Sequence, residues 1–574
     1  MISRNARTRT IGLILEDVFT DFAHDIIHSV SFAVRDRKDL RLVIVAGRQD
    51  NSTDPYDMTH RYKTRYNLIY QMNAPYRFDG LLLAFPNLTC MQRGFYRDIP
   101  KVYLAATLPD ELTVNYDDGM GIREAVDYLV RIKDVTRLCM LGGREDNADA
   151  QRRRRLFRQA LEDNGLAWNE GMYEPADMST QTQEPAARLL ARNPDTQAVF
   201  CVNDATAVGL YDVLRGRELT PGKDVYVFGF DNGQLAANMT PPLASIGADG
   251  MTLGQKALEL LLEKMDGEDV SSRLVPTHLY GRDSLEYGMS GVSAREMLNA
   301  DPSVINSFFD NCFYRYRNEI VGHGNINLKR LFFEIYSRIL KAMKNRIMAD
   351  DEYAEIRRLI EVLFRNGIML YTDPNRFVRH ISSLQNAMNE TMKPGLVCTR
   401  INHLFSLIRD KAIQFHGVQR NSVIDDYNTG RNRILDFLTW TTNYGSPGEE
   451  ALDYMIHRLD RIGLKNAALF LYREPVQYGE EEGQALPETV FLRCVLRNGE
   501  LFVIPGDRQE CPASEIYDRS ELPPESLGYI SYPLFCGEYL FGILVSAMDE
   551  KQLEIGEFLA FQLSRSISVN WLSR

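Results

Sequence analysis

Residues 198–267 read AVFCVNDATAVGLYDVLRGRELTPGKDVYVFGFDNGQLAANMTPPLASIGADGMTLGQKALELLLEKMDG and decide the fold. Two short apolar runs, residues 198–202 and 225–229, flank a segment with helical character. The first run is followed by the polar pair Asn203-Asp204 and the second leads into Asp231-Asn232. Strand, polar loop, helix, strand and polar loop is the order of an α/β sheet, which binds ligands at the carboxyl ends of its strands.

The same alternation extends towards the N-terminus. Apolar runs at residues 10–15, 40–46 and 78–85 have the length and composition of buried parallel strands. Helical patterns separate these runs, as the crossover connections of a parallel sheet require. We therefore predict a doubly wound α/β domain over residues 1–288.

Residues 198–267 resemble the ligand-sensing core of the LacI/GalR type. The resemblance implies the periplasmic-binding-protein-like I fold, in which two doubly wound lobes enclose a ligand cleft. Residues 149–161, DAQRRRRLFRQAL, resemble the family helix that begins with a ligand-facing arginine and ends in Phe-x-x-Ala-Leu. Phe157 and the Ala160-Leu161 pair match that ending, which assigns the ligand-facing position to Arg153. The family's glycine is replaced by Leu156, and the alternative is that Arg153 lies on the exposed helix face.

The resemblance also implies further ligand contacts, from two aromatic positions in the first loop and four polar positions at strand ends. These residues are Phe19, Phe22, Asp117, Asn203, Asp204 and Asp231. An arginine fork, carboxylates and an aromatic platform suit a small polyhydroxylated molecule such as a sugar or nucleoside, because each hydroxyl both donates and accepts. The alternative for Asp204 and Asp231 is that they cap the helices that follow them.

The rest of the chain has a different pattern. Residues 289–431 carry long helical repeats, including apolar positions at three-to-four spacing over 328–348, and are predicted to form a helical connector or bundle. Residues 432–574 follow the order of a GAF-like domain: helices at 434–442 and 447–462, antiparallel strands, and a last helix at 552–572. The end of this last helix, rich in Leu559, Leu563 and Ile567, is expected to pass a signal onward.

The order of these three parts resembles the sensory half of bacterial signalling proteins that continue into a diguanylate cyclase or a kinase. The sequence has no Gly-Gly-Asp/Glu-Glu-Phe motif and no kinase phosphate loop. Only ten residues precede Ile11, so we expect no direct DNA binding through a recognisable N-terminal headpiece. The output is expected to reside in a separate protein; the alternative is that the chain is a truncated or degenerate member whose output domain is missing.

Composition limits the class of protein. The formal net charge is −12, which argues against a protein whose main function is to bind nucleic acid. No apolar run approaches the roughly 20 residues that span a bilayer, and the first ten residues lack the apolar core of a signal peptide. The eight cysteines show no Cys-x-x-Cys spacing, as expected of reduced thiols. We therefore predict a cytoplasmic protein without a membrane partner.

Catalysis and metal binding are not predicted. His24 and His28 stand four residues apart on a predicted helix and could hold one edge of a zinc ion, but no third ligand is evident. No nucleophile and base can be placed together, and no cofactor is implied.

The favoured hypothesis is a homodimeric regulatory sensor whose lobes close on a ligand and signal through the helical region to the C-terminal end. The alternative is a solute-binding component of an uptake system.

Overall fold

The computed structural model describes three long segments of the chain. They are residues 8–286 with gaps at 19–20, 36, 49–57, 85–93, 95, 107, 109 and 249; residues 327–415 with a gap at 373; and residues 464–572 with gaps at 479–483, 524–527 and 549. A few isolated residues between these segments are also described.

The chain divides into two compact units. One contains Met1–Asn115, Gly250–Leu274 and Asp426–Arg574, and the other contains Tyr116–Asp249 and Val275–Asp425. We call residues 8–115 with 250–274 the first lobe, 116–249 with 275–286 the second lobe, 327–415 the helical region and 464–572 the C-terminal domain. The first unit therefore combines the first lobe with the C-terminal domain, although residues 275–463 separate them in the sequence.

The first lobe is built on a parallel sheet with the strand order β2-β1-β3-β4-β5. Its strands are β1 (Arg9–Leu15), β2 (Leu40–Ala46), β3 (Gly80–Ala84), β4 (Lys101–Leu104) and β5 (Thr113–Asp117). Its helices are α1 (Asp21–Arg35), α2 (Met58–Tyr66), α3 (Leu68–Asn73) and α10 (Gly250–Met265). Helix α10 packs against α1, where a Cβ on Gly254 would lie only 2.0 Å from Ser29 Oγ. Glycine at this position thus permits the close approach of the two helices.

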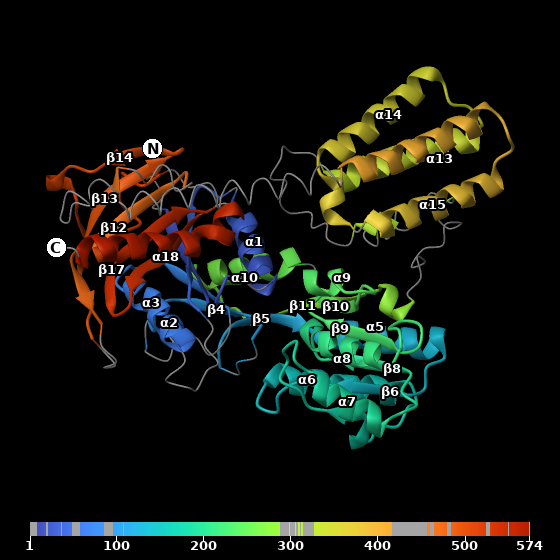
Figure 1. Cartoon of the computed structure of the whole chain (residues 1–574), viewed down its shortest axis with the longest axis horizontal. Helices are drawn as coiled ribbons and strands as arrows, with labels where there is room; N and C mark the ends of the chain where they lie inside the picture. Colours follow the sequence, from blue (N-terminus) through green and yellow to red (C-terminus); the bar gives the residue numbers. More distant parts are fainter. Residues whose placement is uncertain are drawn as a thin grey trace. The chain divides into compact units, whose positions relative to one another are not determined.

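The second lobe carries residues 198–249 of the stretch that decided the fold, whereas the last helix of that stretch, α10, belongs to the first lobe. Its parallel strands have the order β7-β6-β8-β9-β10, and β11 pairs antiparallel with β10. The strands are β6 (Leu138–Leu141), β7 (Tyr173–Glu174), β8 (Ala198–Cys201), β9 (Tyr226–Phe230), β10 (Ala244–Ala248) and β11 (Arg273–Tyr280). The helices are α5 (Asp118–Lys133), α6 (Ala148–Asp163), α7 (Gln183–Arg192), α8 (Asp204–Gly216) and α9 (Gln234–Asn238) (Figure 1). The predicted parallel α/β fold is confirmed here.

Strand alternation explains why both faces of this sheet are covered. Phe200 and Phe228 contribute to the core shared with α5 and α6, whereas the neighbouring Val199 and Val227 contribute to the core shared with α7 and α8. Because successive side chains of a strand point to opposite faces, an unbroken apolar run requires cover on both sides.

The helical region contains α13 (Leu328–Asn345), α14 (Asp350–Arg365), α15 (Pro374–Thr391) and a helix over 396–415. These agree with the predicted helical pattern, although the pattern over 351–370 reads as one helix and the structure divides it into α14 and a short 3-10 helix over Ile368–Tyr371. Helix α14 ends earlier because Gly367 adopts a φ of 78°, a left-handed conformation that interrupts the helix.

The C-terminal domain is an antiparallel sheet with the order β16-β17-β12-β13, and β14 and β15 also pair with β13. Its elements are β12 (Ala467–Gln477), β13 (Thr489–Arg497), β14 (Glu500–Val503), β15 (Glu510–Pro512), β16 (Tyr529–Cys536), β17 (Tyr539–Ala547) and α18 (Glu550–Leu572). The predicted strands and last helix are confirmed. The predicted helix at 434–442 and most of that at 447–462 lie outside the described residues, so the GAF-like assignment stays a prediction.

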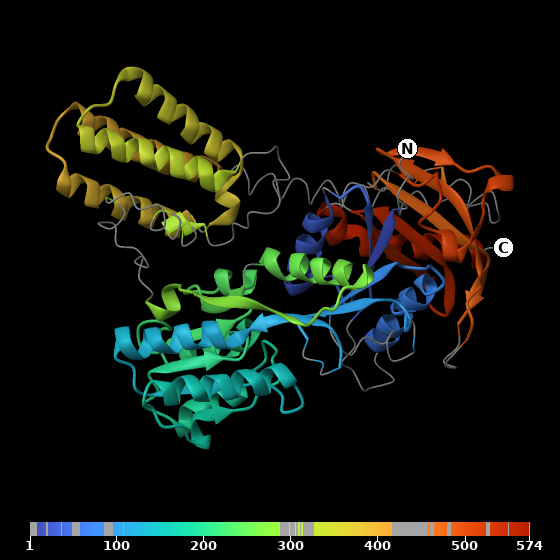
Figure 2. The ribbon, with the colours of Figure 1, turned by 180° about the vertical axis from the view of Figure 1, so that it is seen from behind.

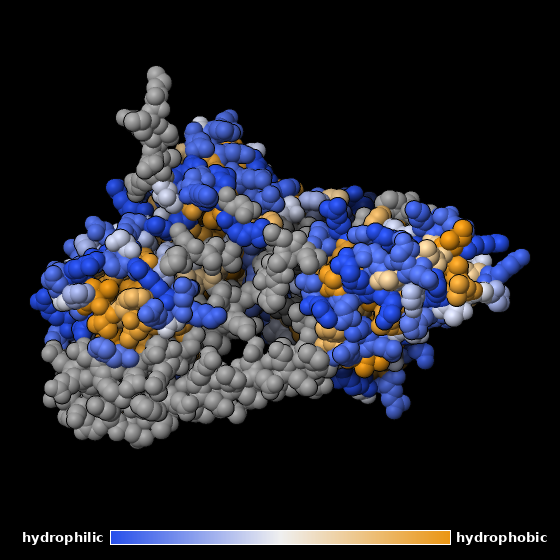
Figure 3. Space-filling view, turned by 90° about the horizontal axis from the view of Figure 1, so that it is seen from above, coloured by the Kyte–Doolittle hydropathy of each residue, from blue (hydrophilic) through white to orange (hydrophobic). Residues whose placement is uncertain are grey.

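Two further properties concern the surface. Among the described residues, no helix combines the length and apolarity needed to cross a membrane. The described surface in Figure 3 is mainly hydrophilic, with smaller hydrophobic patches. In α18, Leu559, Leu563 and Ile567 are at most 4% exposed because the helix packs on β16 and β17, whereas Val569 near its end is 47% exposed. That this end of α18 passes a signal onward stays a prediction.

Candidate ligand-binding site

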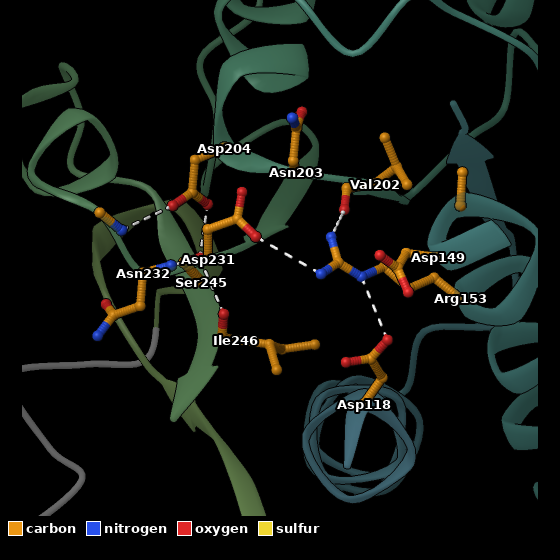
Figure 4. A network of polar contacts seen from close by, with 12 residues as sticks. Asp118, Asp149, Arg153, Val202, Asn203, Asp204, Asp231, Asn232, Ser245 and Ile246 are labelled. Carbon is orange, nitrogen blue, oxygen red and sulfur yellow. Dashed lines mark hydrogen bonds and ion pairs between the residues drawn. The ribbon is translucent and has the colours of Figure 1, made fainter. Parts of the chain in front are cut away.

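The second lobe brings most of the predicted polar residues together at one edge of its sheet (Figure 4). Asn203 and Asp204 follow β8, and Asp231 follows the neighbouring strand β9. Arg153 reaches this edge from α6, and Asp118 reaches it from the first turn of α5. Asp204 and Asp231 therefore lie at the same edge of the sheet as Arg153 and Asp118, because neighbouring parallel strands end at one edge. The described hydrogen bonds of Asn203 go to Thr206 and Met178 instead.

Arg153 is the arginine of α6 that faces inward. Only 7% of the residue is exposed, and it shares the buried face of the helix with Phe157 and Ala160. Its Nη1 donates to the carbonyl oxygen of Val202 at 2.7 Å, and its guanidinium carbon lies 3.6 Å from the centre of the Phe230 ring. The predicted helix register is thus confirmed, while contact between Arg153 and a ligand stays a prediction.

Asp118 is the principal counter-ion at this position, and sequence reasoning missed it. Its Oδ2 accepts from Arg152 at 2.8 and 3.1 Å and from Nε of Arg153 at 3.4 Å. The other oxygen of this fully buried carboxylate has no hydrogen-bond partner among the described residues. The side chain of the predicted Asp117 has no described hydrogen bond, and its carbonyl accepts from Thr277 Oγ1 at 2.6 Å. Asp118 therefore holds the arginines, and a ligand contact by Asp117 stays a prediction.

Asp231 presents a carboxylate that is only partly used by the protein. Its Oδ1 lies 3.5 Å from Nη2 of Arg153, and 46% of its side chain is exposed. Its φ is 104°, which is rare for any residue other than glycine, and its N–H donates to Ile246 at 2.8 Å. The alternative that Asp231 caps α9 is not supported, because α9 starts after Gly233 and has no side-chain cap hydrogen bond.

Asn203 and Asp204 are engaged within the lobe. Asn203 caps α8, since its Oδ1 accepts from the N–H and hydroxyl of Thr206 at 2.9 and 2.6 Å, and its Nδ2 donates to Met178 at 3.0 Å. Asp204 accepts from Ser245 Oγ at 2.5 Å and from the N–H of Gly233 at 3.0 Å. Their described contacts are structural, and contact with a ligand stays a prediction for both.

The two aspartates differ in their protonation behaviour. Burial, followed by the charge of Asp231, raises the pKa of Asp204 to about 8. Partial loss of hydration also raises the pKa of the half-exposed Asp231, to about 6, while the positive charge of Arg153 lowers it. The smaller rise in pKa at Asp231 agrees with its exposure and its cationic neighbour.

A second group of polar residues, also missed from the sequence, supports the loop after β9. Arg282 is 2% exposed and donates to the carbonyl of Leu243 at 2.7 Å and to Oδ1 of Asn232 at 2.5 Å. The N–H of Asn232 donates to Ser245 Oγ at 3.0 Å. These bonds fix the backbone next to Asp231. The Asp231-Asn232 pair itself was visible in the sequence, but nothing local indicated that Arg282 reaches it.

The remaining predicted features lie outside the described residues or outside this polar network. Phe19 and the side chain of Phe22 lie outside the described residues. His24 and His28 have ring centres 6.4 Å apart, and no cluster of three metal-binding side chains occurs in the described part of the chain. A cavity of about 350 Å³ lies elsewhere, in the first unit, where Met72, Tyr472 and Val490 line it.

Part of the chain is similar to a known protein family and to proteins named as transcriptional repressors. Residues 126–285 match the family model described as a periplasmic binding protein-like domain. The "HTH-type transcriptional repressor PurR" of Vibrio vulnificus strain CMCP6 is 28% identical over 290 residues, which cover 49% of this chain and 82% of the relative. The "Ribose operon repressor" of Escherichia coli strain K12 is 34% identical over 197 residues, covering 33% of this chain and 59% of that protein.

Among solved structures, the "transcriptional regulator CelR-cellobiose complex" has 25% identity and a TM-score of 0.41, covering 49% of this chain and 85% of that one. A TM-score this low supports no conclusion. The family match and the curated relatives support a LacI/GalR-type sensor domain with the periplasmic-binding-protein-like fold. The relatives are named as repressors rather than enzymes, in agreement with the prediction. Because one is named as helix-turn-helix type, the comparisons do not support the expected absence of a DNA-binding headpiece.

Proposed function

We propose that this chain is a regulatory protein that senses a small polyhydroxylated molecule, such as a sugar or a nucleoside. The observation that carries the proposal is the pairing of buried Arg153 with half-exposed Asp231 at the carboxyl ends of two parallel strands. This pair lies within the region that matches a ligand-binding family. The relatives' names support a role in transcription regulation.

The chemistry of the pair suits a ligand with neighbouring hydroxyl groups. The guanidinium of Arg153 donates in a planar fork, and the Asp231 carboxylate accepts from hydroxyl groups. Their separation of 3.5 Å is longer than a close ion-pair hydrogen bond, so a ligand oxygen that accepts from Arg153 would replace a weak contact. Asp118 and Phe230 hold Arg153 in place from the side of the protein. A cytoplasmic location, a homodimer, a separate output protein and a GAF-like C-terminal domain belong to the same proposal.

A thermal-shift screen with sugars, nucleosides and polyols tests this function. At least one of these compounds is expected to raise the Tm of the wild-type protein in a concentration-dependent way. Asp231→Ala is expected to abolish the shift. Asp163→Ala, at an exposed aspartate of α6, is the matched control and should respond like the wild type. The proposal fails if no compound in the screen stabilises the protein, or if Asp231→Ala responds as the wild type does.

A further inference from the structure

The first lobe and the C-terminal domain share one β-sheet. Strand β16 pairs in parallel with β2, with Tyr529 opposite Val43, Ile530 opposite Ile44 and Ser531 opposite Val45. Figures 1 and 2 both show the orange and red C-terminal strands beside the blue strands of the first lobe. Strand β2 therefore has a neighbour on each side, β1 and β16, and is not an edge strand.

The sequence of β2 fits this interior position. LRLVIVA has one charged residue in seven, and five consecutive residues from Leu42 to Ala46 are buried. Exposed edge strands usually carry charges or proline that prevent pairing with other chains, and β2 has neither along those five residues. A Cβ on Gly528, which precedes β16 and has a φ of 139°, would lie 2.6 Å from the carbonyl oxygen of Leu42. Glycine is thus needed where β16 begins to approach β2.

Buried polar bonds fasten the two parts. Tyr517 and Asn73 are fully buried, and the Tyr517 hydroxyl donates to Oδ1 of Asn73 at 2.6 Å. Nδ2 of Asn73 donates in turn to Ser531 Oγ at 3.2 Å and to the carbonyl of Ile69 at 2.8 Å. Each group in this chain of bonds has a partner, so separating the two parts would leave polar groups unpaired in an apolar core.

Two charged contacts also join the first lobe to the C-terminal domain. Arg48 of the first lobe forms an ion pair with Glu557 of α18. Glu557 is 6% exposed and also accepts a hydrogen bond from the Tyr62 hydroxyl at 2.9 Å. Arg41 of β2 donates to the carbonyl of Tyr517 at 2.8 Å and to Asp518 at 3.0 Å. One hydrophobic cluster also includes side chains of both parts, such as Val43, Val45, Phe470 and Val545.

We propose that the first lobe and the C-terminal domain fold and move as one cooperative body. A ligand-driven displacement of the first lobe then carries the C-terminal domain with it directly, without a signal through the helical region. The occupied edge of β2 is also closed to strand pairing with a second copy of the chain. The cooperative body rests on contacts within the first unit alone, whereas its role in signalling rests on the function proposed above.

Hydrogen exchange of the full-length protein at increasing urea tests this proposal without any ligand. Backbone amides of β1 in the first lobe and of β12 in the C-terminal domain are expected to lose protection with the same urea midpoint. Different midpoints for β1 and β12 would overturn the proposal. Failure of the ligand screen would leave this result unaffected, so the two proposals can fail separately.

A pair of conservative variants provides a second readout. Tyr517→Phe removes one buried hydroxyl and is expected to increase the exchange rate about tenfold in both β1 and β12, with β8 of the second lobe unchanged. The control is Tyr173→Phe, which removes a buried hydroxyl that donates to Gly143 at 3.3 Å, and its effect should be confined to the second lobe. An effect of Tyr517→Phe on β12 but not on β1 would contradict a single cooperative body. If Tyr517→Phe does not fold, the urea midpoints of the wild type decide.

Discussion

The guanidinium carbon of Arg153 lies 3.6 Å from the centre of the Phe230 ring, so the two side chains form a cation–π contact. Phe230 is 1% exposed. Phe228 lies two residues earlier on the same face of β9, and no cation–π contact to its ring occurs among the described residues. The Phe230 ring therefore contributes both to the core and to the orientation of Arg153.

Replacing each phenylalanine separates these two contributions. Phe230→Leu and Phe228→Leu are both expected to destabilise the protein, by roughly 1–2 kcal/mol, because each shrinks a buried ring. Only Phe230→Leu is expected to weaken binding of a ligand found in the screen, since only Phe230 orients Arg153. Urea denaturation and calorimetric titration measure the two effects. Equal affinities of the two variants would count against a positioning role for Phe230.

The backbone at Asp231 gives a second prediction. Its φ of 104° is strained for a residue with a Cβ, and glycine relieves this strain. Asp231→Gly and Asp231→Ala both remove the carboxylate, so both should lose the ligand response. The glycine variant is expected to be more stable than the alanine variant by about 1 kcal/mol. Urea denaturation compares the two, and an alanine variant at least as stable as the glycine variant would refute the strain at this position.

The raised pKa of Asp204 predicts a dependence of stability on pH. Because its pKa of about 8 exceeds that of an unfolded aspartate, about 4, the folded protein retains a proton that the unfolded chain has lost between these values. Protonated Asp204 therefore contributes its whole stabilisation below about pH 4, and this stabilisation is lost as the pH rises towards 8. Asp204→Asn mimics the protonated form, so its Tm should exceed that of the wild type increasingly as the pH rises. A constant difference in Tm between pH 5 and pH 8.5 would be incompatible with a raised pKa at Asp204.

Asn203 is predicted to act as a helix cap. Asn203→Ala removes the acceptor for Thr206 and is expected to cost about 1 kcal/mol of unfolding free energy. Asn203→Asp keeps the acceptor for Thr206 but loses the donor to the Met178 carbonyl, so it should restore part of that stability. If Asn203 acts as a cap alone, the ligand affinity of Asn203→Asp stays within about twofold of the wild type. Parallel urea and titration measurements distinguish the roles. A large loss of affinity in Asn203→Asp with intact stability would instead indicate that the amide contacts the ligand.

Much of this architecture could be predicted because its signals are local. The apolar run of β2 gave its bounds, residues 40–46, and the resemblance of residues 149–161 to the family helix assigned the inward position to Arg153. Asp117 and Asp118 were harder to distinguish, because they are adjacent at the start of a helix where one step turns the side chain by about 100°. Which of the two meets Arg153 depends on how α5 packs against α6.

The features that could not be predicted from the sequence depend on contacts between residues far apart in the chain. The pairing of β2 with β16 joins residues nearly 500 positions apart, and the composition of neither strand indicates which strand it pairs with. Arg282 reaches Asn232 across 50 residues of sequence in the same way. Such contacts depend on the packed structure rather than on periodicity, so a single sequence gave no expectation for them.

Calorimetric titration of Arg153→Lys tests the central claim most directly, using the sugar or nucleoside that gives the largest thermal shift. Lysine keeps the positive charge but lacks the planar fork, so binding is expected to weaken by about tenfold or more. Arg155→Lys, at an exposed arginine of the same helix, should bind within about twofold of the wild type. Wild-type affinity in Arg153→Lys would contradict the proposal that this arginine recognises the ligand.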